Sequence, residues 1–240
     1  MNIEDKKVAF TLAEVLITLG IIGVVAALTL PTLINKYKER VLVERLKQTY
    51  SIFSQAYLRA VVDNGMPDNW DIGERNSMEG AEKLYDILTA YMKLGKSCKS
   101  EYGCFAQEYK TLDGNTYGYA PANHPMYVRG ILANGVAFAM PSSGSGCELE
   151  NDVYKNICSV LYVDLNGYSR PNQAGIDYFG FYITTKGIIP MGLQGWNGGA
   201  NGYTCEKSGT SRGNGTGCTA WVLSHGNMDY LRQDISTDEE

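Results

Sequence analysis

The sequence predicts an α+β fold in which a long N-terminal helix packs on an antiparallel β-sheet with disulfide-stapled loops. Three observations predict it. Residues 10–34 are apolar apart from one charge, Glu14, and a helical repeat of apolar residues continues to residue 64. Beyond residue 126, short apolar runs alternate with turn signals typical of strands. All six cysteines lie in the C-terminal two thirds of the chain. A long helix followed by several strands is the element order of a layered α+β domain.

Composition limits the classes of function. The 240 residues hold 21 basic and 26 acidic side chains, a net charge of −5, so no nucleic-acid partner is expected, because phosphate binding needs a basic face. The two histidines, His124 and His225, lie about a hundred residues apart. No hydrolase, nucleotide-binding or zinc-protease motif occurs. We therefore expect no enzyme activity.

The apolar run is long enough to cross a membrane, since a hydrocarbon core of about 30 Å needs roughly 20 residues of helix. An ordinary secretory signal has a shorter apolar core and a small-residue cleavage site after it. Glu14 is the informative residue, because a carboxylate at membrane depth needs a partner or a purpose. The simpler alternative is that Glu14 lies near the headgroups in the first helical turn, where the helix dipole favours an anion.

The start of the chain carries a recognisable pattern. Residues 1–9 form a polar leader with Lys6 and Lys7, and FTLAEVLITLGIIGVVAA follows from Phe10. This pattern resembles the class III signal of the type IV pilin and type II secretion pseudopilin family. In that family a membrane peptidase cuts before the Phe and methylates the new amine, which here implies cleavage between Ala9 and Phe10. The family usually has Gly where this chain has Ala9. Three further residues match the family's assembly positions: Glu14, Gly23 and Pro31.

The resemblance implies a structural subunit that is processed by prepilin peptidase and assembled into a type IV pilus or a type II secretion pseudopilus. Its implied partners are other pilin-like subunits, an inner-membrane assembly platform and membrane lipid. The precursor would cross the bacterial inner membrane once, with its globule outside the cytoplasm. Glu14 of one subunit would neutralise the Phe10 amine of a neighbour, because a buried charge is tolerated only when it is paired.

The helix is expected to continue beyond the membrane. Apolar residues recur with helical spacing and predict one buried face, and Gly65 and Pro67 form a stop signal. A helix over residues 10–64 would be about 80 Å long, and Pro31 should loosen it. We therefore divide the chain into a leader (1–9), a transmembrane and filament-core helix (10–34), an amphipathic helix (35–65) and a globular domain (66–240). The apolar face consists of Leu42, Leu46, Tyr50, Phe53, Tyr57 and Val61.

Within the globule we expect one more helix, several strands and a long loop. Asn134-Gly135 between two apolar runs predicts a hairpin with a type I′ turn. Residues 191–218 are rich in glycine and predict a loop anchored by Trp196 and Trp221. The expected helix covers residues 79–93, and the expected strands cover residues 127–133, 136–140, 159–163, 178–184 and, as a short segment, 188–189.

The cysteine spacings contain no C-x2-C pair, which argues against a zinc ribbon. An even number of cysteines in an exported, loop-rich region predicts disulfides. Six cysteines allow fifteen connectivities, and we expect the three local pairs. The alternative is free buried thiols in a reducing compartment. The expected pairs are Cys98–Cys104, Cys147–Cys158 and Cys205–Cys218.

Charge gives a competing indication of orientation. Five basic residues lie between Lys36 and Lys47, against two in the leader, and the positive-inside rule would therefore place the globule in the cytoplasm. We give the cysteines more weight, and they favour an oxidising compartment.

The segment from Asp164 to Asp177 has two interpretations. Its spaced oxygen side chains around glycine resemble a calcium loop, and some secretion pseudopilins carry a calcium site in their β-region. The ligands would be Asp164, Asn166 and Asp177. The other interpretation is a plain turn, since Asp, Asn, Gly and Pro are turn residues. No cofactor other than this calcium ion is expected.

A second function remains open at the sequence level. A single-pass anchored binding or adhesin domain would use the many tyrosines, the tryptophans and the glycine-rich loop as its surface. It would not need Glu14.

Overall fold

The computed structural model describes residues 11–118, 121, 124–150, 154–192, 202–233 and 235. The chain forms two compact units, Met1–Arg40 and Val41–Glu240. Helix α1 (Leu12–Asn64) contributes to both. Each unit is described by itself.

The described residues of the first unit lie at the start of α1, and the expectation that one helix continues past Pro31 as far as Asn64 is confirmed. The helix continues through Pro31 and is described from its first turn onward. Every side chain from Thr11 to Lys38 is exposed except that of Ala26, which is half-buried. The apolar side chains of this stretch therefore do not contribute to a hydrophobic core formed by the described residues.

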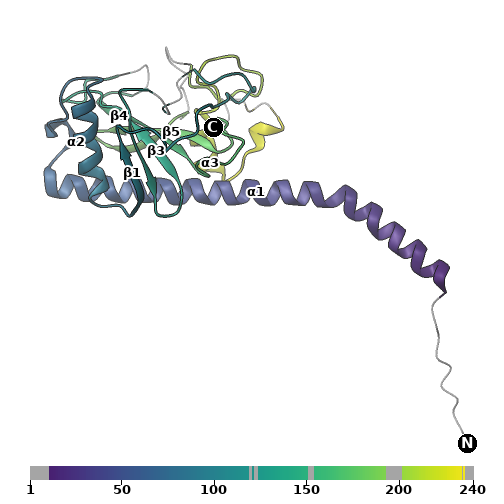
Figure 1. Ribbon diagram of the computed structural model, residues 1–240. Coiled ribbons are helices and arrows are strands. Elements are labelled where there is room, and N and C mark those ends of the chain that lie inside the picture. The colour runs from purple at the N-terminus through teal and green to yellow at the C-terminus, as the bar shows by residue number, and fades with distance from the viewer. Residues whose placement is uncertain are drawn as a thin grey trace, which may run out of the picture. The chain divides into compact units, whose positions relative to one another are not determined.

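The second unit is built around the C-terminal part of α1, which packs on one face of the sheet (Figure 1). Leu46, Phe53 and Tyr57 are buried, and the other members of the predicted apolar face pack against them at partial exposure. The Phe53 ring meets Phe138 edge-on, with 5.3 Å between centroids. The Tyr50 ring stacks on Phe181 at 5.9 Å. The amphipathic pattern thus correctly identified the face that builds the core.

The sheet is a six-stranded antiparallel meander in which the strands follow their order in the chain. The fold class is therefore α+β, as predicted. A short 3-10 helix, η1 (Pro67–Asn69), follows α1, and another, η3 (Asp229–Leu231), lies near the C-terminus. The remaining elements are α2 (Met78–Thr89), β1 (Leu94–Lys99), β2 (Val128–Leu132), β3 (Ala137–Met140), β4 (Ile157–Asp164), β5 (Tyr178–Thr184), β6 (Gly187–Pro190) and α3 (Cys218–His225).

Helix α2 is shorter than predicted, and an unpredicted strand follows it. Ser77 caps its start by accepting a hydrogen bond from the Gly80 amide at 3.1 Å. The helix ends at Thr89 rather than Lys93, because β1 starts at Leu94 and needs a turn before it. Strand β1 lies at the edge of the sheet, has two irregularities in its pairing with β2 and is mostly exposed. Its sequence therefore lacks the alternation that marks a half-buried strand.

The predicted hairpin is present, but its turn is of another type. The Gly135 amide donates to the Leu132 carbonyl at 2.9 Å, and the Leu132 amide donates to Val136 at 2.8 Å. Gly135 has a φ of +87°, whereas Asn134 is not among the residues with positive φ. A type I′ turn needs positive φ at both central residues, so the prediction was wrong. The loop is instead the three-residue form, in which glycine takes the left-handed position after a type I turn.

The second face of the sheet carries a tyrosine-rich core. Ten of the 17 tyrosines are buried, so most of them do not form the aromatic surface that the adhesin alternative expected. Loop residues such as Phe105 and Tyr203 cover this face. Seven tyrosines belong to this second core: Tyr109, Tyr117, Tyr154, Tyr162, Tyr178, Tyr182 and Tyr203.

The described residues of the glycine-rich segment, 191–192 and 202–217, form a loop as predicted, and α3 begins at Cys218. Trp221, predicted to anchor it, lies inside α3, where its indole donates to Asn227 at 2.9 Å. Helix α3 ends at His225, and Gly226 closes it with a φ of +69°. Trp196, the other predicted anchor, lies outside the described residues.

Candidate functional site

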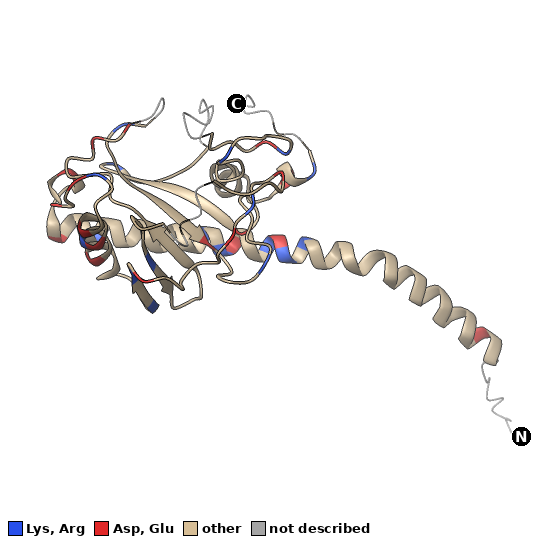
Figure 2. Ribbon diagram, turned by 45° about the horizontal axis from the view of Figure 1, so that its top comes forward, with Lys and Arg blue, Asp and Glu red and all other residues tan. Residues whose placement is uncertain are grey.

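The first unit offers a candidate membrane-spanning segment. Among the described residues, α1 is the one helix long and apolar enough to cross a bilayer, with a mean hydropathy of 2.3 over its best window and none of that window buried. Figure 2 shows no charged position in this stretch of ribbon apart from one acidic position near its start. That position is Glu14, in the first turn of the helix.

Glu14 closes a hydrogen-bonded ring at the start of α1. Its Oε2 accepts from the Thr11 amide at 2.8 Å and from the Thr11 hydroxyl at 2.9 Å. The Thr11 hydroxyl in turn accepts from the Glu14 amide at 3.2 Å. This is a capping box, in which two side chains satisfy two helix-end amides reciprocally. Glu14 therefore has a partner within its own helix.

The capping box was missed in the sequence, although its signal is present. A Thr followed three residues later by Glu, directly before an apolar run, is the sequence pattern of this motif. It adds Thr11 to the residues that set the orientation of the Glu14 carboxylate. The pairing of Glu14 with a neighbouring copy stays a prediction.

The other predicted assembly residues lie in the same helix. Gly23 has open space where a Cβ would stand, so nothing within the chain requires glycine there. Pro31 leaves the carbonyl four residues before it without its helical N–H donor. Ala9 and Phe10 lie outside the described residues.

All six cysteines are paired in three local disulfides, as predicted. The Cα atoms are 6.2 Å apart in Cys98–Cys104, 4.0 Å apart in Cys147–Cys158 and 4.7 Å apart in Cys205–Cys218. No free cysteine is found. Disulfides of this kind persist in oxidising compartments.

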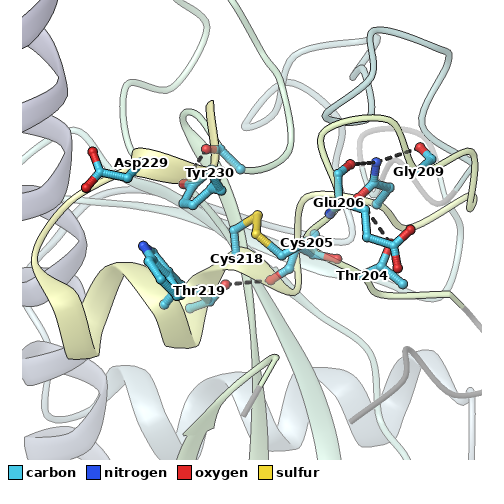
Figure 3. Close-up of a disulfide and its surroundings, with 12 residues drawn as sticks. Thr204, Cys205, Glu206, Gly209, Cys218, Thr219, Asp229 and Tyr230 are labelled. Carbon is cyan, nitrogen blue, oxygen red and sulfur yellow. Dashed lines mark hydrogen bonds between the residues drawn. A yellow bond between two sulfur atoms is a disulfide. The ribbon is translucent and has the colours of Figure 1, made fainter. Parts of the chain in front are cut away.

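The third disulfide fastens a described part of the glycine-rich segment to α3 (Figure 3). Cys218 is the first residue of α3 and belongs to the core beneath α1. Next to it, the Thr219 hydroxyl donates to the Thr216 carbonyl at 2.7 Å and accepts from the Gly180 amide at 3.1 Å. The disulfide thus connects a surface loop to the middle of β5.

The structure brings the three predicted metal ligands together in the connection between β4 and β5. Asn166 joins the two carboxylates, because its amide donates to Asp164 at 3.1 Å and its side-chain nitrogen donates to Asp177 at 3.1 Å. Asp164 also accepts from the Tyr109 hydroxyl at 2.5 Å. Asp177 accepts from the amides of Asn172 and Gln173 at 2.9 and 2.6 Å. The segment is therefore a turn closed by Asp177.

Both carboxylates are fully buried, and their electrostatics reflect it. Burial, followed by the charge of Asp177, raises the pKa of Asp164 to about 8. Burial also raises the pKa of Asp177, while the amides of Gln173 and Asn172 act in the opposite direction. No Lys or Arg among the described residues bonds to either carboxylate.

Two amide oxygens near this turn have no hydrogen-bond partner. These are the buried Oδ1 atoms of Asn166 and Asn172. Carboxylates and amide oxygens together are the ligand set that calcium prefers, so the donor chemistry fits such an ion. No group of three or more His, Cys, Asp or Glu side chains able to hold a metal occurs in the described part of the chain.

The two histidines each engage an aromatic ring. His124 lies in the loop before β2 and meets Tyr127 edge-on, with 5.0 Å between ring centroids. His225, the last residue of α3, stacks on Trp221 at 3.7 Å.

Comparison with known proteins gives a family but no described activity. No curated protein and no solved structure matched the chain. One family model matched residues 32–226, which is most of the chain and begins directly after Pro31. The chain therefore belongs to the "Family of unknown function (DUF6613)".

Proposed function

We propose that this chain is a pilin-like structural subunit. The observation that carries the proposal is the division of α1, whose first part exposes an apolar surface with Glu14 near its start, while its second part builds the core of the globule. The resemblance of residues 1–31 to prepilins supports the same function. The three disulfides support a globule outside the cytoplasm.

In this proposal the precursor crosses the inner membrane once, and prepilin peptidase removes residues 1–9. The new amine at Phe10 would then meet the Glu14 carboxylate of a neighbouring copy in a type IV pilus or a secretion pseudopilus. A shift by one position would leave both charges unpaired among apolar side chains. The ion pair would therefore fix the register, while the apolar faces of the helices supply the affinity.

Processing is tested by mass spectrometry of the mature N-terminus, from cells with and without prepilin peptidase. We expect an N-methylated chain starting at Phe10 only when the peptidase is present. The variant Ala9→Gly, which restores the family's usual residue, should be cleaved at least as completely. An intact Met1 in the presence of the peptidase would contradict the proposal.

The role of Glu14 is tested by two variants that separate its charge from its cap. Glu14→Gln removes the charge but keeps a side chain that can close a capping box. Thr11→Val removes the capping hydroxyl but keeps the charge. If the charge pairs with a neighbour, Glu14→Gln loses filament assembly while Thr11→Val retains it, as measured by filament shearing and immunoblotting.

Glu44→Gln is the matched control, because Glu44 lies on the same helix and only forms an exposed pair with Lys47 at 3.0 Å. It should assemble normally. All three variants should remain in the membrane after carbonate extraction. Normal assembly of Glu14→Gln would contradict the ion pair and favour the anchored binding domain.

We further propose that the connection between β4 and β5 binds a calcium ion through Asp164, Asn166 and Asp177. The two buried carboxylates and the partnerless oxygen of Asn166 support it. The ion would supply positive charge to two carboxylates that no Lys or Arg among the described residues pairs with, and so stabilise the turn. It would take no part in chemistry.

Thermal unfolding with calcium or with a chelator tests this site. Calcium should raise the melting temperature of the unaltered protein and should not raise that of Asp177→Asn. Asp86→Asn, which removes an exposed carboxylate, is the control and should respond like the unaltered protein. An equal response to magnesium, or no response to calcium, would contradict the calcium site and favour the interpretation of this segment as a plain turn.

A further inference from the structure

A ring of basic side chains follows the apolar part of α1. Lys36, Lys38 and Arg40 lie within five consecutive residues, all exposed, and Tyr37 among them is 68% exposed. All four belong to the first unit. Figure 2 shows charged positions on α1 directly after its uncharged stretch.

The spacing of this ring matches the layers of a bilayer. From Leu12 to Ile34 the helix rises about 33 Å at 1.5 Å per residue, close to the hydrocarbon thickness of about 30 Å. From Lys36 to Arg40 it rises about 6 Å. The headgroup layer on each side of a bilayer is about 5–7 Å thick. The ring therefore has the position and height of one headgroup layer.

The distribution of the charges around the helix fits a crossing geometry. Lys36 and Arg40 are one turn apart and share a face, whereas Lys38 lies about 200° around the axis from Lys36. A helix that lies on a membrane presents its basic residues along one side. A helix that passes through a headgroup layer meets lipid on all sides, and charges distributed around its axis suit that environment.

Tyr37 gives a second, independent indication. Tyrosine is enriched where a transmembrane helix leaves the hydrocarbon, because its ring is apolar and its hydroxyl is polar. The long apolar stems of Lys and Arg can lie along the acyl region while their charges stay at the surface. Tyr37, an exposed tyrosine between two lysines and three residues after Ile34, combines both features.

We propose that Lys36, Lys38 and Arg40, with Tyr37, form a binding surface for the headgroups of anionic phospholipids. Basic residues next to a membrane segment attract anionic lipid, and salt screens the attraction. Residues 36–40 hold three basic side chains and one acidic side chain, Glu39, so this segment is positive in a chain whose net charge is −5. The proposal rests on the membrane-anchoring part of the proposed function and is independent of cleavage and assembly.

Lipid retention by the full-length protein tests the proposal. The protein is reconstituted in nanodiscs of phosphatidylcholine and phosphatidylglycerol at three to one, released into the gas phase and analysed by native mass spectrometry. The unaltered protein should retain phosphatidylglycerol several-fold above its share of the bilayer. A variant with Lys36→Gln, Lys38→Gln and Arg40→Gln should lose this enrichment, and salt should weaken it in the unaltered protein.

The matched control changes three exposed lysines of the globular unit to glutamine, at Lys110, Lys155 and Lys186. It removes the same charge and should retain the enrichment. Equal retention by the ring variant and the unaltered protein, or equal loss in the control, would overturn the proposal. Carbonate extraction distinguishes failure of the lipid proposal from failure of the membrane anchor, because release of the unaltered protein from the membrane would contradict the anchor itself. Failed cleavage at Phe10 would leave the lipid result intact.

Discussion

Arg129 holds together the loops that cover the second face of the sheet. It is fully buried, and burial is the main reason that the pKa of its guanidinium is lowered. Its nitrogens donate to carbonyl oxygens of Pro121 and Tyr127 at 2.8 Å each, and also to those of Ser100 and His124. The fork of five N–H donors that only Arg carries makes this arrangement possible. Four carbonyls depend on one side chain.

We therefore predict that Arg129→Lys lowers the free energy of unfolding by about 2–4 kcal/mol, because the ammonium group leaves several of these buried or part-buried carbonyls without a donor. Urea unfolding measures the change. Arg232→Lys, at an exposed pair with Asp229, is the control and should change stability by less than about 0.5 kcal/mol. Equal effects of the two variants would show that the carbonyls find other donors.

At the scale of residues, the sequence identified the important ionisable side chains but not all of their hydrogen-bond partners. Glu14 was recognised as requiring a partner, but the nearest one, Thr11, was not named, although the capping pattern is readable from the sequence. Asp164, Asn166 and Asp177 were grouped correctly, whereas Asn172 and Tyr109 were not. Tyr109 lies 55 residues before Asp164 in the chain, and only the folded sheet brings such residues together.

At the scale of elements, the tyrosine-rich core predicts how the protein responds to alkali. Burial is the main cause that raises the pKa of Tyr154 to about 12. It raises the pKa of Tyr117, Tyr162 and Tyr178 well above 10. The unfolded chain releases these protons near pH 10, and the folded chain keeps them. Stability contributed by this core is therefore present below about pH 10 and is lost as the pH rises further.

We expect the buried tyrosines of this core to ionise only together with unfolding. Absorbance at 295 nm and far-ultraviolet circular dichroism, followed in one titration, check this. Ionisation of all tyrosines near pH 10 with an unchanged dichroism spectrum would contradict the prediction.

The disulfides offer a second test at this scale. Cys205–Cys218 encloses a separation of 13 residues and Cys98–Cys104 one of six. In the loop-entropy account the longer loop contributes about 3 kcal/mol and the shorter one roughly 0.7 kcal/mol less. Replacing each pair by alanine, one pair at a time, should lower stability in that order in urea unfolding. The reverse order would show that local packing outweighs loop closure.

The elements that the sequence predicted well are those with a periodic apolar face. The second part of α1 repeats every three or four residues, and strand β5 was predicted with its observed bounds because all its residues are apolar or aromatic apart from Gly180 and Thr184. Edge strand β1 was missed because it depends on pairing with β2 rather than on local pattern, and the end of α2 was missed with it because β1 starts at Leu94. The turn at Asn134-Gly135 was predicted correctly, but its type was not. The type depends on the sign of φ at Asn134, and asparagine is compatible with either sign.

At the scale of the whole molecule, the two units have different origins of stability. Val43 and Leu46 are the first buried residues of α1, and both belong to the second unit. The first unit has no buried side chain within the described residues. Its apolar surface therefore gives no stability in water and calls for lipid or other copies, whereas the globule has its own core and disulfides.

We predict that a chain starting at Val41 folds without the first unit. It should be soluble, show one cooperative thermal transition and contain three disulfides by mass spectrometry. A shorter chain starting at Ser51 is the control, because it lacks Val43, Leu46 and Thr49, all of which are buried. Removing two large apolar core side chains should lower the free energy of unfolding by several kcal/mol, since each contributes about 2–5 kcal/mol. If the chain starting at Val41 were as unstable as the shorter one, the apolar half of α1 would be part of the globule's fold, and its role as a separate membrane and assembly segment would have to be abandoned.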